Sequence, residues 1–333
     1  MSKTSNSELE PAWKAWHSEE SPITLGVSSC LLGQAVRYDG GHARDPFVDA
    51  TLGKWVKWLP ICPEVESGMS TPRPAIHLVQ EDSSQTLVAK STGEDFTERM
   101  QSYAQSKTEQ LGALDGYVLK KGSPSCGLER IRVYRANGHV RSRDARGMFA
   151  KQLTDRWPLL PVEEDGRLND PKLRENFIEQ IFCRNRWRVL TQRGLTRGRL
   201  VEFHTAHKLI LRAHDELGYQ RLGKIVGELG TISDEQSFAQ YEGEFHRALK
   251  ILASRKAHTN VLQHAMGYLK ELLETREKQQ LLGSIEDYRL GLIPLVVPVT
   301  LLRHTISRHE IEYLQNQIYF SPHPKELMLR NHV

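Results

Sequence analysis

Short apolar runs alternate with helical patterns along the first half of the chain. Apolar residues at helical spacing predict helices at 47–58, 92–114 and 147–157. Strands are predicted at 24–27, 58–62, 75–79, 86–90 and 159–162, at the start of GYVLKKGSPSCG from Gly116, and in a hairpin around Asn137-Gly138. Strands that alternate with helices in this way predict an α/β fold with an open, mainly parallel sheet.

The pattern changes after a polar linker, EEDGRLND, at 163–170. From Pro171 onward nearly every segment has the helical period, including a capping box at 233–236 and a continuous helical pattern at 260–281. The apolar run at 290–302 is too short to cross a bilayer and contains two prolines, so we predict a buried segment there. The second half of the chain is therefore predicted to be all-α.

Length and composition fit two globular domains. The chain has 333 residues, of which 39% are hydrophobic and 26% are charged. We predict a polar tail at 1–21, an α/β domain at 22–164 and a helical domain at 165–333. The tail lacks the apolar core of a signal peptide, and no apolar run is long enough to span a membrane. We therefore expect a cytoplasmic protein with no membrane partner.

Three cysteines each follow a predicted strand. Cys30 ends ITLGVSSC, Cys62 ends WLPIC, and Cys126 lies at the tip of the turn in GSPSCG. Because ligands gather at the carboxyl ends of strands in an open α/β sheet, we expect these thiols to converge on one metal or cluster site. The absence of a CxxC pair disfavours structural zinc, whereas three thiols suit a 4Fe-4S cluster with one open iron. Two alternatives stay open: Cys183, in FCRNRW, is a fourth ligand, or the first three cysteines are unrelated buried thiols.

Polar residues near these cysteines are candidates for proton chemistry. Glu64 follows Cys62 by two positions, where low dielectric and neighbouring thiolates are expected to raise its pKa toward the range of a general acid or base. Ser123 precedes Cys126 by three positions and is a candidate for a hydrogen bond to the substrate, with a purely turn-forming hydroxyl as the alternative. Asp39, in the Arg-Tyr-Asp loop after Cys30, is the next candidate for proton transfer.

The motifs SSCLLGQAVRYDGG, WLPICPEVESGM and KKGSPSCG together resemble the thiouracil desulfidase family. The helical half, with NVLQHAMGYLK and YFSPHPKELMLRN, resembles the DUF1722 domain that is often fused to it, and the fusion resembles bacterial tRNA 4-thiouridine desulfidases. The resemblance implies that Cys30, Cys62 and Cys126 ligate a 4Fe-4S cluster and that Glu64 and Ser123 are catalytic. It further implies that a thiocarbonyl sulfur binds the open iron while water attacks the carbon, so that 4-thiouridine becomes uridine.

A basic segment in the helical half favours thiolated tRNA as the partner. Residues 183–230 include ten basic and four acidic side chains, a local net charge of +6, although a solvated helix face has the same pattern. Aromatic and imidazole rings in the same segment are candidates to stack on nucleotides: Trp187, Phe203, His204 and His207. The candidate phosphate contacts are Arg184, Arg186, Arg188, Arg197, Arg199 and Lys208.

Other functions remain open at this point. A desulfidase of free 2-thiouracil, or of other thiolated nucleobases and nucleosides, needs only the first domain. A tRNA thiolation enzyme normally activates its substrate with ATP, but the chain has neither a Walker-type GxxxxGK[ST] nor an SGGxDS-like loop, so we expect no nucleotide cofactor. A non-catalytic RNA-binding iron-sulfur protein is the third alternative.

Overall fold

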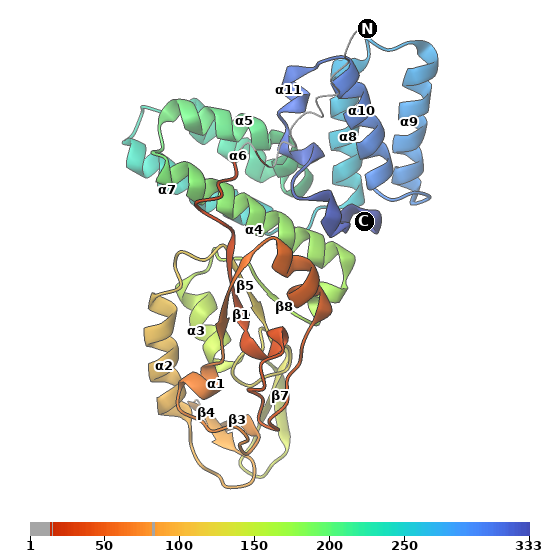
Figure 1. Ribbon diagram of the computed structural model, residues 1–333. Coiled ribbons are helices and arrows are strands. Elements are labelled where there is room, and N and C mark those ends of the chain that lie inside the picture. The colour runs from red at the N-terminus through yellow and green to blue at the C-terminus, as the bar shows by residue number, and fades with distance from the viewer. Residues whose placement is uncertain (1–13, 15, 82–83) are drawn as a thin grey trace. The chain divides into compact units, whose positions relative to one another are not determined.

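The computed structural model describes residue 14, residues 16–81 and residues 84–333 (Figure 1). Pro22–Asp170 forms one compact unit, and Pro171–Val333 forms the other together with the described residues before Pro22. The first unit is α/β and the second is helical, which confirms the predicted fold class. The α/β unit extends past the predicted boundary at 164, and most of the predicted tail lies outside the described residues.

A parallel sheet of four strands, in the order β2-β1-β5-β8, forms the centre of the α/β unit. The two middle strands are almost entirely buried, as expected of a parallel sheet covered on both faces, which explains their nearly continuous apolar sequence. This sheet confirms the predicted parallel arrangement. Its strands are β1 (Thr24–Ser28), β2 (Lys57–Ile61), β5 (Gly116–Leu119) and β8 (Val162–Glu164).

A second sheet in the same unit has the order β4-β3-β6-β7 and mixed pairing, which the sequence analysis did not separate from the first. The predicted hairpin is confirmed, because β6 and β7 pair antiparallel across Asn137-Gly138 and Gly138 has the positive φ of 81° that favours glycine. The strands of this second sheet are β3 (Ile76–Glu81), β4 (Ser84–Ala89), β6 (Ile131–Tyr134) and β7 (Val140–Ala145).

Helices α2 (Thr97–Glu109) and α3 (Met148–Arg156) bury apolar side chains in the core of the α/β unit, and α1 (Pro63–Glu66) is a single turn. The helix predicted at 47–58 is wrong beyond Lys54. Irregular helical turns, η3 (Phe47–Thr51) and η4 (Leu52–Lys54), end there because Lys57 N–H donates to Ile23 O and the following residues join β1 as a strand. Pairing with a buried strand thus overrides helical spacing.

Two other predicted boundaries in the α/β unit are also wrong. The helix predicted at 92–114 begins only at Thr97, because residues 90–92 form a turn and Asp95 then pairs with Val88 in an isolated bridge. The last strand lies at Val162–Glu164 and not at 159–162, because Tyr117 of β5 pairs with Val162. In both cases pairing with a strand determines where the element starts.

The second unit consists of helices, with α8, α9 and α10 packed beside one another (Figure 1). The N-cap half of the predicted capping box is confirmed, since the Ser233 side chain accepts a hydrogen bond from the Gln236 N–H. The helices of the second unit are α4 (Pro171–Gln192), α5 (Arg197–His214), α6 (Glu216–Gly227), α7 (Asp234–Leu249), α8 (Arg255–Leu269), α9 (Thr275–Leu290), α10 (Val296–Arg308) and α11 (Glu312–Gln315).

Two predictions for the helical unit need correction. The continuous helix at 260–281 is wrong, because a capping box between Glu274 and Glu277 starts a new helix, α9, after a break. The run at 290–302 is only partly buried, since Leu295 and Leu302 are inaccessible while Leu292 is 70% exposed. In the part of the chain that the structure describes, no helix has the length and apolar character needed to cross a membrane.

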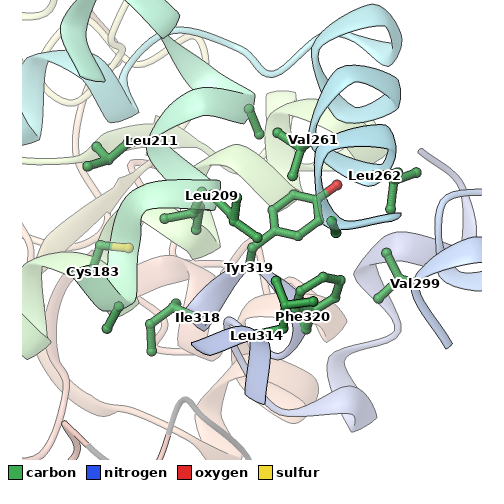
Figure 2. Packing of buried hydrophobic residues seen from close by; sticks show 14 of the residues in the cluster. Cys183, Leu209, Leu211, Val261, Leu262, Val299, Leu314, Ile318, Tyr319 and Phe320 are labelled. Carbon is green, nitrogen blue, oxygen red and sulfur yellow. The ribbon is translucent and has the colours of Figure 1, made fainter. Parts of the chain in front are cut away.

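Apolar side chains from several helices form one core in this unit (Figure 2). Tyr319 and Phe320, near the end of the chain, belong to this core together with Val261 and Leu262 of α8 and Cys183 of α4. The C-terminal segment is therefore part of the core that holds the helices together.

We predict that Gly26→Ala destabilises the α/β unit. A Cβ at Gly26 of β1 would lie 2.2 Å from a ring carbon of the buried Tyr117 on β5, and overpacking of a filled core costs about 1–3 kcal/mol. Gly283→Ala is the control, because that helical position in α9 has open space and alanine favours a helix by about 0.5–1 kcal/mol. Urea denaturation of both full-length variants checks this. Equal midpoints for the two variants would contradict the packing argument.

Candidate metal centre

The three cysteines that follow strands line one cavity of about 300 Å³ in the α/β unit. Cys30 lies in the short helix η2 (Ser29–Leu32) directly after β1, Cys62 directly follows β2, and Cys126 lies in the turn after β5. Because β1 pairs in parallel with both β2 and β5, these strands end at the same edge of the sheet. The structure thus brings together the three thiols that the sequence singled out.

Backbone hydrogen bonds hold each thiol-bearing segment. The carbonyl of Cys30 accepts from the N–H groups of Gly33 and Ala43, and Gly33 has a φ of 87° that favours glycine. The Ser123 hydroxyl accepts from the N–H of Cys126 at 3.1 Å. A Cβ at Gly147 would lie 2.5 Å from backbone atoms of the residue before Cys126, so glycine permits this close approach.

The spacing of the thiols bears on the kind of metal they suit. Among the described residues, the one group of three or more histidine, cysteine or acidic residues with ligand atoms within 4.8 Å of one another does not include these cysteines. A single ion needs its ligands about that close together, whereas a polynuclear cluster separates them by its own width. The cavity therefore suits a cluster better than a mononuclear site.

Cys183 does not belong to this centre. It lies in α4 in the core of the helical unit, where the Arg186 guanidinium donates to its sulfur at 3.5 Å. Burial raises the pKa of the Cys183 thiol to about 12, which makes it a neutral core side chain. The position of Cys183 therefore gives no support to the alternative that it is a fourth ligand.

The cavity makes the three thiols weak acids in the absence of a metal. Burial, and next the neighbouring Cys62, raise the pKa of Cys30 to about 11. Burial also raises the pKa of Cys62, and burial with the charge of Glu64 raises that of Cys126 well above its usual value. Because metals bind thiolates, a cluster bound here would release protons and compensate for this desolvation.

Glu64 lies in the same cavity and is held from both sides. Its Oε2 accepts from Arg73 Nε at 2.9 Å and Nη2 at 2.5 Å, and its Oε1 accepts from the hydroxyl of Ser125 at 2.7 Å. The Ser123 hydroxyl donates to the same Oε1 at 3.4 Å while it accepts from backbone N–H groups of its own turn. Ser123 therefore both shapes the turn and contacts the carboxylate.

Sequence reasoning missed Arg73 and Ser125. Ser125 is adjacent to Cys126, so the cysteine motif already contained that signal, but nothing in the sequence distinguished it from Ser123. Arg73 lies nine positions after Glu64 in a proline-rich loop with no regular spacing, and its side chain is only 5% exposed. A buried arginine beside a glutamate is visible only once the loop is folded.

Asp39 is not among the residues that line the cavity. Its carboxylate is 46% exposed, pairs with Arg37 at 3.3 Å and accepts from the N–H of Gly41. The Gly41 and Arg37 hydrogen bonds lower the pKa of Asp39. Arg37 and Tyr38 do line the cavity, so the loop reaches the site through these two side chains.

Other basic side chains also line the cavity: Arg37, Lys90, Lys120 and Lys121. Lys120 pairs with Asp165 at 2.5 Å. Together these groups offer positive charge near thiolates and near any anionic substrate.

The residues predicted to bind RNA have mixed positions in the helical unit. Arg186 is 2% exposed and donates to the carbonyl of Pro322 and the sulfur of Cys183, so it cannot contact phosphate as predicted. Arg197 and Arg199 are exposed, with Arg197 paired to Asp234 at 2.6 Å. The remaining three candidates are half-buried: Arg184, Arg188 and Lys208.

The structure also contradicts the predicted stacking role of the rings in segment 183–230. Trp187, Phe203, His204 and His207 are all at most 3% exposed and pack against one another in the core of the helical unit. Their rings cannot stack on nucleotides. Arginines and aromatic residues alternate in this segment because a helix presents its charged and its core faces in turn.

A second group of potential metal ligands lies in the helical unit, at Glu175, Glu179 and His323. Arg330 occupies both carboxylates, with hydrogen bonds of 2.9 Å to Glu175 and 2.8 Å to Glu179. Burial would raise the pKa of Glu179, but the hydrogen bond with His214 and the charge of Arg330 lower it below its usual range. This is a compensated charge network and not a metal site.

The fold and the cavity define an α/β domain with a cysteine-lined candidate metal centre. Residues 25–165 match the model of the 2-thiouracil desulfurase family, and residues 208–324 match that of a protein of unknown function, DUF1722. The chain therefore belongs to the 2-thiouracil desulfurase family and has a DUF1722 domain in its helical unit. The resemblance seen in the sequence motifs is confirmed for both halves.

Individual relatives match one half each. YbgA of Escherichia coli K12, an uncharacterized protein, is 31% identical over 168 residues, which cover 49% of this chain and 98% of YbgA. YbbK of Bacillus subtilis 168, also uncharacterized, is 34% identical over 110 residues, which cover 30% of this chain and 71% of YbbK. The solved structure of the 4Fe-4S-dependent thiouracil desulfidase TudS is 33% identical with a TM-score of 0.36, covering 44% of this chain and 93% of that chain.

We predict strong energetic coupling between Glu64 and Arg73. In a double-mutant cycle with Glu64→Gln and Arg73→Met, the coupling should be about 2 kcal/mol, because hydrogen bonds between buried charged groups contribute about 1.5–3 kcal/mol. The exposed pair Lys151–Asp155 is the control and should couple by less than about 0.5 kcal/mol. Urea denaturation of the four full-length proteins measures each cycle. Equal coupling in the two cycles would show that Arg73 does not hold Glu64.

Proposed function

We propose that the protein is an iron-sulfur-dependent desulfidase that converts 4-thiouridine in tRNA to uridine. One observation carries the proposal: the thiols of Cys30, Cys62 and Cys126 and the carboxylate of Glu64 line a single cavity in a 2-thiouracil desulfurase domain. Three thiols would leave one iron of a 4Fe-4S cluster without a protein ligand, and the Glu64 carboxylate in the same cavity would move the proton.

The residues present fit such a cluster. Cys30, Cys62 and Cys126 would hold it, because they converge on one cavity at a spacing that does not suit a single ion. Lys120 and Arg37, which line the same cavity, both lower the pKa of Cys30 and so favour the thiolate that a metal needs. When bound, the cluster supplies a Lewis-acidic iron that polarises the thiocarbonyl bond.

The side chains of this chain supply the proton transfer. Glu64 takes a proton at Oε1 from the water that attacks the thiocarbonyl carbon, while Arg73 holds Oε2 and fixes the orientation of the carboxylate. Ser125 and Ser123 contact Oε1 and keep it directed toward the cavity. One water is consumed, a C–O bond replaces the C–S bond, and sulfur leaves as hydrogen sulfide, so the reaction needs no oxidant or reductant.

Two features of the helical unit support tRNA as the substrate. Arg193, Arg197 and Arg199 are exposed on one stretch of chain, as phosphate-binding residues need to be. A desulfidase of a free base has no need of a second unit of this size. Free 2-thiouracil is the second candidate substrate, and the burial of the predicted stacking residues, such as Trp187 and Phe203, favours it.

We predict that the anaerobically reconstituted full-length protein releases sulfide from 4-thiouridine-containing tRNA with a kcat/KM at least about tenfold above that for free 2-thiouracil, because phosphate contacts add binding energy that a free base lacks. Nucleoside analysis of the treated tRNA measures the loss of 4-thiouridine and the gain of uridine. A higher kcat/KM for 2-thiouracil would assign the free base as the substrate.

Cysteine variants are the controls for that experiment. Cys30→Ala, Cys62→Ala and Cys126→Ala should each lose the visible absorbance of the cluster together with sulfide release. Cys183→Ala should retain both, because that thiol lies in the core of the helical unit. Full absorbance and turnover in Cys62→Ala would overturn the assignment of the ligands.

We predict that Glu64→Gln assembles a cluster with normal absorbance but lowers sulfide release about 10²–10⁴-fold, as removal of a positioned acid or base does. Ser123→Ala should have a smaller effect, since its hydroxyl donates one hydrogen bond to Glu64, which contributes on the order of 1 kcal/mol. Asp39→Asn separates the two acidic candidates and should turn over like the wild type. Normal turnover by Glu64→Gln with loss of turnover in Asp39→Asn would reverse the two roles.

A further inference from the structure

A second cavity, of about 530 Å³, lies in the helical unit. Its lining combines apolar side chains from α4 and α5 with a distinct set of polar and aromatic groups. We call this hollow the arginine cavity. Its polar and aromatic lining residues are Trp16, Arg193, Arg199, Glu202, Thr205 and Asn316. A cavity of this size and mixed lining is typical of sites for small organic ligands.

The two arginines of this cavity have no carboxylate partner in the described part of the chain. Other arginines of the same segment do, since Arg197 pairs with Asp234 and Arg212 with Glu216. Two exposed and uncompensated guanidinium groups in one cavity favour an anionic ligand, and the planar fork of arginine suits a phosphate group.

The Arg199 guanidinium is held in place from one side. Its Nη1 donates to the carbonyls of Arg193 and Gly194, at 2.5 Å and 2.7 Å, just after the end of α4. Within the described residues these bonds use Nη1, so Nε and Nη2 are available to a ligand. An arginine fixed in this way loses little side-chain entropy when it binds an anion.

Trp16 supplies a fixed aromatic wall. Its ring packs edge-on against the buried Phe203, with ring centroids 5.4 Å apart, and lies 6.5 Å from His207. Phe203 and His207 are stacked at 4.0 Å behind it, so the indole rests on rigid core rings. An indole held at the wall of a cavity is a surface on which an unstacked base can lie.

We propose that the arginine cavity binds one phosphorylated nucleoside unit of a single-stranded RNA segment. Arg193 and Arg199 contact the phosphate, Trp16 stacks on the base, and the carboxylate of Glu202 and the amide of Asn316 offer hydrogen-bond partners to the base edge or the ribose. A volume of about 530 Å³ exceeds what a phosphate ion alone needs, and the indole has no role toward such an ion. The choice of RNA as the source of the nucleotide rests on the proposed function.

The test uses full-length protein and a fluorescently labelled oligouridylate, with binding measured by anisotropy over a range of salt concentrations. The double variant Arg193→Ala/Arg199→Ala should weaken binding at least about tenfold and lower the slope of log K against log salt by about 0.7, because the two arginines neutralise one phosphate and each phosphate neutralised on a single strand releases about 0.7 counterion. Trp16→Ala should weaken binding about tenfold without changing the slope, because stacking involves no counterion.

The matched control is Arg276→Ala/Arg289→Ala, which removes the same charge from exposed positions of α9 that do not line the cavity and should bind like the wild type. Equal losses in the two double variants would reduce the arginine cavity to a general charge effect and overturn the proposal. Unlabelled uridine monophosphate is the competitor that tests the choice of RNA. If it competes as well as an equal concentration of oligouridylate sites, the ligand is a free nucleotide and the choice of RNA is overturned.

Circular dichroism melts of every variant show whether a lost affinity reflects lost folding, and the salt slope separates the arginine and tryptophan effects in any folded variant. Sulfide release from 4-thiouridine-containing tRNA by the wild-type protein tests the proposed function separately. A protein that releases sulfide but shows no change on substitution of the cavity contradicts this inference alone. A protein that releases none but binds oligouridylate through the cavity contradicts the proposed function alone.

Discussion

The candidate site depends on the parallel pairing of β1 with β2 on one side and β5 on the other. Ser28 is in register with Ile61, and Val27 with Val118, so the three strands end together and the chain leaves each of them at the same edge. The thiols are 32 and 64 residues apart in sequence, yet each needs only a short turn to reach the shared cavity. A slip of one residue in either pairing would reverse the faces of that strand and separate the thiols.

The cavity places opposing demands on its side chains. Burial keeps the thiols protonated when no metal is present, and burial is also what an oxygen-sensitive cluster and a reactive thiocarbonyl group need. The structure balances this with charges placed in pairs, Glu64 with Arg73 and Lys120 with Asp165. A carboxylate that is already paired on one oxygen presents the other oxygen in a defined orientation, which is how a general base is positioned before the substrate arrives.

The sequence predicted what local patterns encode and missed what depends on distant partners. The parallel strands and the three thiols followed from apolar runs that end in cysteine, and the structure bears out the sheet that places them. The helix at 47–58 failed because β1 recruits Lys57 and its neighbours into a strand, which spacing alone cannot reveal. Arg73 was missed for the same reason, since its partner Glu64 reaches it through an irregular loop.

The helical unit shows the limit of reading charge from sequence. A run of arginines and rings at 183–230 is compatible both with an RNA surface and with an amphipathic core, and the structure buries part of it and exposes the rest. Arg186 and Trp187 are buried, whereas Arg193 and Arg199 are exposed beside Trp16, a residue from the segment expected to be a tail. Only the folded arrangement shows which charges have partners within the chain and which are free to meet a ligand.

In the proposed reaction, water supplies the oxygen that replaces sulfur, and Glu64 is the base. The most direct measurement is to run the reaction of the reconstituted protein on 4-thiouridine-containing tRNA in ¹⁸O-labelled water and to weigh the product nucleoside by mass spectrometry. The proposed reaction gives uridine with a single ¹⁸O atom for each sulfide released. Uridine without the label, or sulfide release without the formation of uridine, would contradict it.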